Sequence, residues 1–241
     1  MLVWIASYPR SGNTLTVLTL HDVFGIRGMG AIWDDDLALG QLRHRLVPLR
    51  EAPKWQPPPD LDGLTGEALL SALCDRPELY FVKTHRLSDA THPAPALYIV
   101  RDGRDALVSH AHLVKSRKVL RFEGMPFNRR LSTLIHPGIP GYGRWEANTM
   151  AWRRRDAPVV VVRYEELVTD PVAVVAGACK EIGVELPEPS GEMLSFESLR
   201  EQKPTLFRRG ITGAWRDEMP EHLHERFWKI HGSEMRSLGY H

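Results

Sequence analysis

With 241 residues, 25% of them charged and 43% hydrophobic, the chain has the size and composition of an ordinary globular domain. Its 31 basic and 30 acidic side chains leave a net charge of +1, which gives no electrostatic reason to expect nucleic acid or a membrane surface as a partner. No apolar run has the length that spans a bilayer, and no basic segment marks a signal peptide. Cys74 and Cys179 are far apart in the sequence, so we expect reduced thiols in a single cytoplasmic domain, residues 1–241.

Four short apolar runs predict buried strands, at 2–6, 79–82, 96–100 and 159–162. Other segments predict helices, at 13–24, 34–45, 65–73, 106–114, 143–155, 171–182, 193–201 and 220–238. Apolar strands that alternate with amphipathic helices are typical of a parallel sheet covered on both faces. We therefore expect an α/β fold of three layers, in which helices flank a central parallel sheet of four to five strands.

Two segments rich in proline or glycine, 48–60 and 121–144, are expected to be irregular. Loops of this length inside a compact domain are usually functional. They carry four aromatic side chains: Trp55, Phe122, Phe127 and Tyr142. We expect these aromatic groups to line a pocket for a small apolar or aromatic molecule.

The first predicted strand leads into a turn with the features of an anion site. Residues 7–14 read Ser-Tyr-Pro-Arg-Ser-Gly-Asn-Thr and precede a helix, whose first backbone N–H groups and dipole attract anions. Arg10 adds a cation that can donate two hydrogen bonds to a phosphate or sulfate. The Walker pattern G-x-x-x-x-G-K-[ST] is absent, because Asn13 follows Gly12 where that pattern has lysine. This turn alone also fits an ordinary strand–helix connection.

Polar side chains follow each predicted strand at its C-terminal end. Arg10 follows the first strand, Lys83 and His85 the second, Arg101 the third and Tyr164 the fourth. The C-terminal ends of parallel strands share one edge of a sheet, where ligands bind in such folds. We therefore expect these groups to converge on one anionic ligand.

Four stretches, in this order, resemble the sulfotransferases that use 3′-phosphoadenosine 5′-phosphosulfate (PAPS). The turn at 8–14 is similar to the family's Tyr-Pro-Lys-Ser-Gly-Thr loop, and 83–85 matches its Lys-Thr-His. Arg101 and Ser109 match an arginine and a serine eight residues apart, and 208–215 is similar to the family's Arg-Lys-Gly segment with a later glycine and tryptophan. The resemblance implies a P-loop-like fold and transfer of the sulfuryl group of PAPS to a hydroxyl or amine of a small acceptor.

The resemblance also implies how the nucleotide is bound. One turn would bind the 5′-phosphate through its backbone and hydroxyl groups: Ser11, Gly12, Asn13 and Thr14. A second set would bind the 3′-phosphate: Arg101, Ser109, Arg208, Arg209 and Gly210. Tyr164 and Phe196 would lie at the adenine, although Phe196 also fits a core position. Leu15 stands where many members have a tryptophan that stacks on the adenine.

The resemblance implies three catalytic residues, His85, Arg10 and Lys83. His85 would take the proton of the acceptor, as suits an imidazole near neutral pH. Arg10 stands in place of the family's lysine beside the bridging oxygen. Because a guanidinium does not deprotonate, Arg10 would stabilise the departing phosphate by charge rather than donate a proton to it.

No metal is implied, and the product nucleotide would be adenosine 3′,5′-bisphosphate (PAP). Two other functions stay open. A P-loop kinase would need magnesium and ATP, and a non-catalytic nucleotide-binding protein on the same fold would not need His85. The identity of the acceptor and the oligomeric state are also open.

Overall fold

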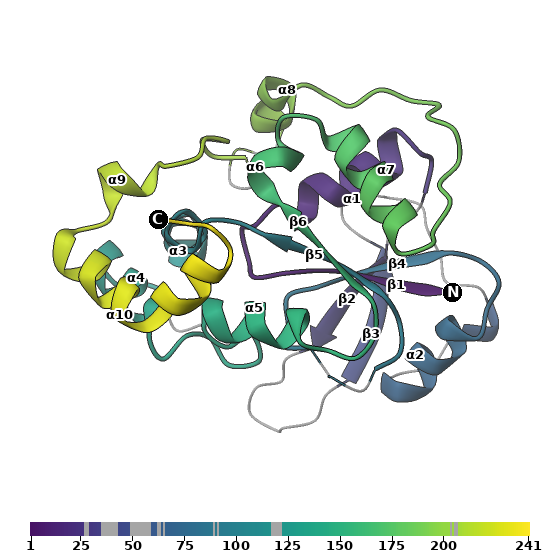
Figure 1. Ribbon diagram of the computed structural model, residues 1–241, viewed down its shortest axis with the longest axis horizontal. Helices are drawn as coiled ribbons and strands as arrows, with labels where there is room; N and C mark the ends of the chain where they lie inside the picture. Colours follow the sequence, from purple (N-terminus) through teal and green to yellow (C-terminus); the bar gives the residue numbers. More distant parts are fainter. Residues whose placement is uncertain are drawn as a thin grey trace.

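The computed structural model describes the chain except for residues 27–28, 35–42, 49–58, 62–63, 65, 89, 91, 117–121, 203 and 205–206. Its centre is a six-stranded sheet with the strand order β3-β2-β4-β1-β5-β6 (Figure 1). The strands are β1 (Leu2–Ser7), β2 (Met29–Asp34), β3 (Arg43–Pro48), β4 (Tyr80–Thr84), β5 (Ala96–Val100) and β6 (Val159–Arg163). Neighbouring strands are parallel, except that β3 is antiparallel to β2.

The four predicted strands correspond to β1, β4, β5 and β6, and the predicted α/β fold with a parallel sheet is confirmed. The predicted helix at 34–45 is wrong, because β2 ends at Asp34 and β3 begins at Arg43. The acidic residues at 34–36 resemble a helix start, but Asp34 is the last residue of β2 and pairs with Arg43 of β3. Residues 35–42, between these strands, lie outside the described part of the chain.

The α-helices described are α1 (Asn13–Asp22), α2 (Gly66–Cys74), α3 (Gly103–Leu113), α4 (Phe127–Ile135), α5 (Trp145–Arg153), α6 (Tyr164–Leu167), α7 (Pro171–Glu181), α8 (Phe196–Gln202), α9 (Trp215–Glu218) and α10 (Glu221–Ser237). Two short 3₁₀ helices, η1 (Pro59–Leu61) and η2 (Val114–Ser116), complete the set. Helix α4 lies inside 121–144, which we expected to be irregular. It forms because Leu131, Leu134 and Ile135 recur at helical spacing and are fully buried.

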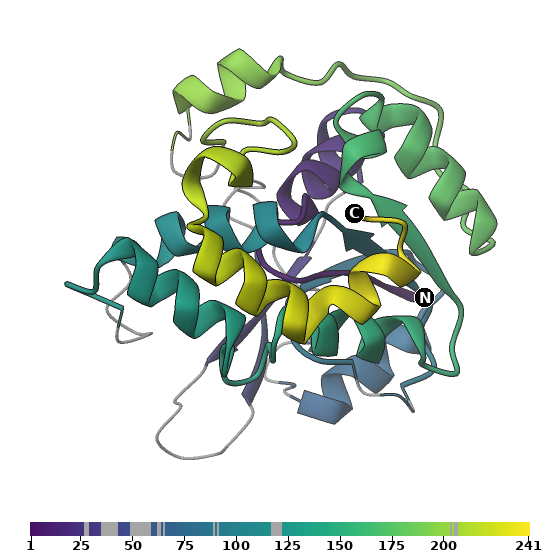
Figure 2. The same ribbon diagram turned by 60° about the vertical axis from the view of Figure 1, so that its left-hand side comes forward.

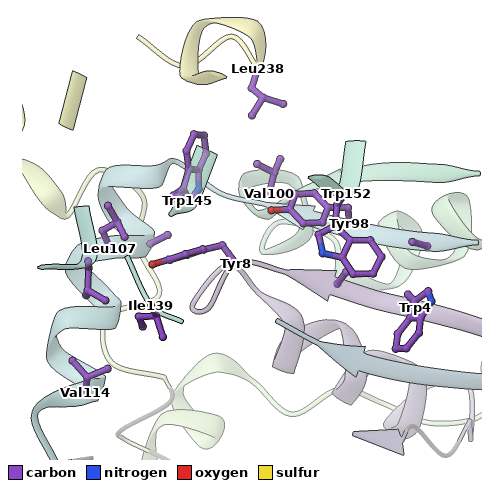
Figure 3. Packing of buried hydrophobic residues seen from close by; sticks show 14 of the residues in the cluster. Trp4, Tyr8, Tyr98, Val100, Leu107, Val114, Ile139, Trp145, Trp152 and Leu238 are labelled. Carbon is purple, nitrogen blue, oxygen red and sulfur yellow. The ribbon is translucent and has the colours of Figure 1, made fainter. Parts of the chain in front are cut away.

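Helices cover both faces of the sheet (Figures 1 and 2). Along β1, Trp4 faces one core, which includes buried residues of α2, α3, α4, α5 and α10, whereas Val3 and Ile5 face another with α1 and α7. Figure 3 shows part of the first core, where Tyr8, just beyond β1, lies between Trp145 and Ile139. The central strands β1, β4 and β5 are therefore buried on both sides, and a ligand would reach them at an edge of the sheet.

The strand register brings the C-terminal ends of four strands to the same level. Ala6 of β1 pairs with Thr84 of β4, and Ser7 pairs with Ile99 of β5. Val100 of β5 pairs with Arg163 of β6. The segments that follow these strands therefore lie next to one another along one edge.

No described helix combines the length and the apolar composition that crossing a bilayer requires. Cys74 and Cys179 form no disulfide with each other, and Cys179 is buried.

Gly103, at the start of α3, is packed so closely that a side chain would displace its neighbours. A Cβ atom there would lie 2.8 Å from the Trp145 ring and 2.9 Å from the Phe227 ring. We expect Gly103→Ala to lower the free energy of unfolding by about 1–3 kcal/mol, measured by urea denaturation.

Gly177→Ala in α7 is the matched control, because no atom lies within 4 Å of a Cβ built at Gly177. It should leave stability unchanged or raise it by about 0.5–1 kcal/mol, since alanine favours a helix over glycine. Equal stability of the two variants would contradict the close packing of α3 against α5 and α10.

Candidate active site

One pocket lies where the C-terminal ends of β1, β4 and β5 meet α1, α3, α6 and the segment 207–214. It is lined by every predicted site residue except one: Arg10, Gly12, Asn13, Thr14, Lys83, His85, Arg101, Ser109, Tyr164, Phe196, Arg208, Arg209 and Gly210. The exception, Ser11, is buried in the same turn, and its hydroxyl has no hydrogen-bond partner among the described residues. Groups two hundred residues apart in sequence therefore share one cavity.

The turn at 8–12 depends on two residues in left-handed backbone conformation. Arg10 has φ +73° and Gly12 has φ +110°. A Cβ atom at Gly12 would lie 2.8 Å from the Tyr164 ring, so this position requires glycine for space as well as for backbone freedom. The chain then enters α1, whose N-terminal backbone N–H groups face the turn.

Asn13 braces the sheet beneath this turn. Its side-chain amide donates to the carbonyls of Ile5 (3.0 Å) and Thr84 (3.1 Å) and to the Ser7 hydroxyl (3.2 Å), which joins β1 to β4. The Asn13 side chain thus points into the protein. The group of Asn13 that could contact an anion in the turn is therefore its backbone N–H, and its role there stays a prediction.

Three cations lie around the turn and are ordered by hydrogen bonds. Arg10 Nε donates to Ser109 Oγ at 3.0 Å, and Lys83 Nζ donates to Thr14 Oγ1 at 3.1 Å. Arg101 donates to the Arg10 carbonyl at 3.1 Å. This arrangement concentrates positive charge beside the N-terminus of α1, where the helix dipole adds to it.

His85 is held by its Nδ1 atom, which lies 2.9 Å from the Ser7 carbonyl oxygen. Because a carbonyl oxygen only accepts, this contact assigns the proton of the neutral ring to Nδ1 and leaves Nε2 able to take a proton. The fully buried Asn148 of α5 donates to the backbone carbonyls of His85 (3.0 Å) and Tyr142 (2.9 Å). His85 is therefore held in place both through its imidazole ring and through its backbone carbonyl.

Arg101 joins the first turn of the chain to its C-terminal part. Besides the Arg10 carbonyl, it donates to the Ile211 carbonyl at 3.0 Å, and its guanidinium lies 4.2 Å from the centre of the Tyr164 ring. Its Nε is buried and has no hydrogen-bond partner in the described part of the chain. A buried donor of this kind in a pocket fits an anionic ligand.

Asp105, which sequence reasoning missed, fastens the segment 207–215 to α3. Its carboxylate accepts from the backbone N–H groups of Gly213 (2.7 Å) and Trp215 (3.0 Å). Burial raises the pKa of this carboxyl, and Arg101 together with the two N–H groups opposes the rise. The spacing in the sequence could have indicated Asp105. It lies four residues after Arg101 and four before Ser109, and residues four apart in a helix lie on the same face.

Arg208 and Arg209 line the pocket and are both paired with Glu218 of α9. Next to them Phe196 lies so close to Gly210 that a Cβ atom on the glycine would come within 2.3 Å of its ring. The predicted adenine residue Phe196 and the predicted phosphate segment are therefore in direct contact.

Of the aromatic side chains expected to line a pocket, three lie in the described part of the chain, and one of these three lines the pocket described here. Tyr142 lines the pocket, with its ring centre 6.1 Å from that of His85. Phe122 is buried in the core and Phe127 packs against that core, because both belong to the packing of α4 rather than to the pocket. Trp55 lies outside the described residues.

Among the described residues, no three histidine, cysteine, aspartate or glutamate side chains are grouped as a metal site requires.

Comparison with known proteins identifies the family to which the chain belongs. A model of the sulfotransferase domain matches residues 2–239. The chain belongs to the sulfotransferase family. This confirms the resemblance that the four motifs carry, and it does not favour the kinase or the non-catalytic alternative.

Curated relatives and solved structures agree with this membership. Mouse sulfotransferase 4A1 is 26% identical over an alignment of 249 positions, gaps included, which covers 97% of this chain and 80% of the relative. Mouse sulfotransferase SULT7A1, solved in complex with PAP, has a TM-score of 0.63 at 16% identity, covering 98% of this chain and 84% of that one. Retinol dehydratase in complex with androsterone and the inactive cofactor PAP has a TM-score of 0.61 at 19% identity, covering 97% and 80%. These structures share the fold of this enzyme.

The two hydrogen bonds that Asp105 accepts predict how it orders the pocket. We expect Asp105→Asn to destabilise the protein by about 1.5–3 kcal/mol, since each backbone donor loses a charged acceptor. Hydrogen exchange of the amides in 207–215 should rise by about tenfold or more, measured by mass spectrometry. Asp156→Asn, at an exposed aspartate, is the control, and equal exchange of 207–215 in both variants would contradict this role.

Proposed function

We propose that this sulfotransferase transfers the sulfuryl group of PAPS to a hydroxyl or an amine of a small acceptor and releases PAP. The observation that carries the proposal is the convergence of two separate anion-binding sets in one pocket, one in the turn before α1 and the other around Arg101 and Arg208. A nucleotide with phosphates at both the 3′ and the 5′ positions needs two such sets. Residues 1–241 would act as one domain, and its cysteines, which form no disulfide, fit the cytoplasm.

The turn before α1 would bind the 5′-phosphate. The N–H groups at the start of α1, the buried Ser11 hydroxyl and the Thr14 hydroxyl offer donors, and Lys83 orients Thr14. Arg10 would lie beside the bridging oxygen, on which charge builds as the sulfur–oxygen bond breaks. The positive φ of Arg10 and its bond to Ser109 order this cation before the reaction.

The second set would bind the 3′-phosphate. Arg101 and Arg208 each have a buried Nε atom without a hydrogen-bond partner in the described part of the chain. Ser109 and Gly210 line the same pocket, and Arg209 follows Arg208 along it. A doubly charged phosphate satisfies these donors better than water does.

The adenine would lie among apolar side chains. Leu15, Tyr164, Val168 and Phe196 line the pocket beside the two phosphate sets. Phe196 rests on Gly210 and meets the Phe207 ring at an angle of 80°, so one aromatic face is fixed. Leu15 and Val168 would supply aliphatic contact in place of the second aromatic ring.

His85 would act as the general base. PAPS supplies a sulfuryl group whose sulfur bonds to the acceptor atom as its bond to the 5′-phosphate oxygen breaks. His85 Nε2 would take the acceptor's proton, since Nδ1 donates to the Ser7 carbonyl. Tyr142, whose backbone Asn148 ties to that of His85, would orient an aromatic or apolar acceptor next to the base.

His85→Ala tests the base. We expect the rate of sulfuryl transfer from PAPS to 2-naphthol, or to another hydroxyl compound that wild type sulfates, to fall by about 10²–10⁴-fold. The reason is that no base remains to take the proton of the attacking hydroxyl. The affinity of this variant for PAP, measured by calorimetry without magnesium, should stay within about twofold of that of wild type. Both proteins should bind PAP far more tightly than ADP with magnesium. Full activity of His85→Ala, or preference for ADP–magnesium, would contradict the proposal.

Two substitutions of Arg10 test whether its charge stabilises the departing phosphate. Arg10→Lys keeps a cation and should retain activity within about tenfold, whereas Arg10→Ala should lower kcat by about 10²–10³-fold. Both variants are compared with wild type at saturating PAPS, so that a change in kcat is separated from weaker binding. Activity of Arg10→Ala equal to that of Arg10→Lys would mean that the charge at this position does not assist the departure of the phosphate.

A further inference from the structure

One carboxylate holds both arginines of the second anion-binding set. Arg208 donates to Glu218 through Nη2 (2.7 Å) and Nη1 (3.2 Å), and Arg209 donates to the same carboxylate through Nη1 (3.1 Å). His112 of α3 contacts the other side of this carboxylate through Nε2. Glu218 therefore connects the two arginines to α3, the helix that also carries Ser109.

Glu218 engages only one edge of the Arg208 guanidinium. Glu218 takes hydrogens from both terminal nitrogens, and Nε, on the adjacent edge, is buried without a hydrogen-bond partner in the described part of the chain. Arg208 lines the pocket. A guanidinium can bind two anions at once, one at its end and one along its Nε side, because it has five donors.

The surroundings of Glu218 favour the negatively charged form of its carboxyl group. Burial favours the neutral carboxyl, but hydrogen bonds from Arg208 and His112 outweigh it and keep the pKa of Glu218 below its usual value. Its side chain is 18% exposed. The neighbouring Asp217 is 70% exposed, and its side chain pairs with Arg209 at 3.4 Å but with no other side chain in the described part of the sequence.

We propose that Glu218 is a positioning residue that orders Arg208 and Arg209 for the 3′-phosphate of the nucleotide. The proposal rests on the function proposed above. Without the carboxylate, two long cationic side chains would have to be immobilised when the nucleotide binds, and that ordering lowers affinity. The acid is part of the site even though it repels the phosphate, because it acts through the arginines.

The test compares PAP with adenosine 5′-phosphate, which lacks the 3′-phosphate, by calorimetry on the full chain. We expect Glu218→Gln to weaken binding of PAP by about tenfold and to change binding of adenosine 5′-phosphate by less than twofold. Asp217→Asn removes the same charge from the adjacent residue and should leave both affinities within about twofold. His112→Gln, which alters only the anchor on α3, should weaken PAP selectively and by less than Glu218→Gln.

Three outcomes would overturn the proposal. PAP binding that is unchanged or tighter in Glu218→Gln would mean that the carboxylate is indifferent or competes with the phosphate. Equal weakening of both nucleotides would mean that Glu218 supports the pocket as a whole. Wild-type protein that binds PAP no more tightly than adenosine 5′-phosphate would instead contradict the 3′-phosphate site, and with it the proposed function.

Discussion

The site depends on the two backbone hydrogen bonds that Arg101 donates. One reaches the Arg10 carbonyl in the turn after β1, and the other reaches the Ile211 carbonyl near the C-terminal end of the chain. Because Arg101 follows β5, the strand next to β1, a single buried guanidinium joins the sheet edge to both segments. The pocket exists only while these segments are held together.

Around Arg101, one face of α3 carries the groups that complete the connection. Asp105 holds the backbone of Gly213 and Trp215, Ser109 holds Arg10, and His112 holds Glu218. These residues recur at spacings of three and four, so they lie along one stripe of the helix. A single helix thereby orders cations of both proposed anion-binding sets, which would favour binding of a nucleotide without a large change of conformation.

The sequence predicted the convergence of these polar residues on one pocket better than it predicted the periphery of the fold. Polar residues such as His85 and Arg101, placed directly after apolar strands, indicated their common edge, because strand direction alone decides where they lie. The strands β2 and β3 were missed because the acids at 34–36 imitate a helix start. Asp105 and Glu218 were missed because the contacts that give them a role are not local. The N–H groups that donate to Asp105 lie 108 and 110 residues away, and the partners of Glu218 lie 9, 10 and 106 residues away.

The most direct measurement is a crystal structure of the enzyme with adenosine 3′,5′-bisphosphate. We predict the 5′-phosphate at the backbone N–H groups of residues 11–14, and the 3′-phosphate within hydrogen-bond distance of Arg101 and Arg208. His85 Nε2 should face the open side of the 5′-phosphate. A nucleotide bound with neither phosphate at Arg101 and Arg208, or bound outside this pocket, would contradict the central claim.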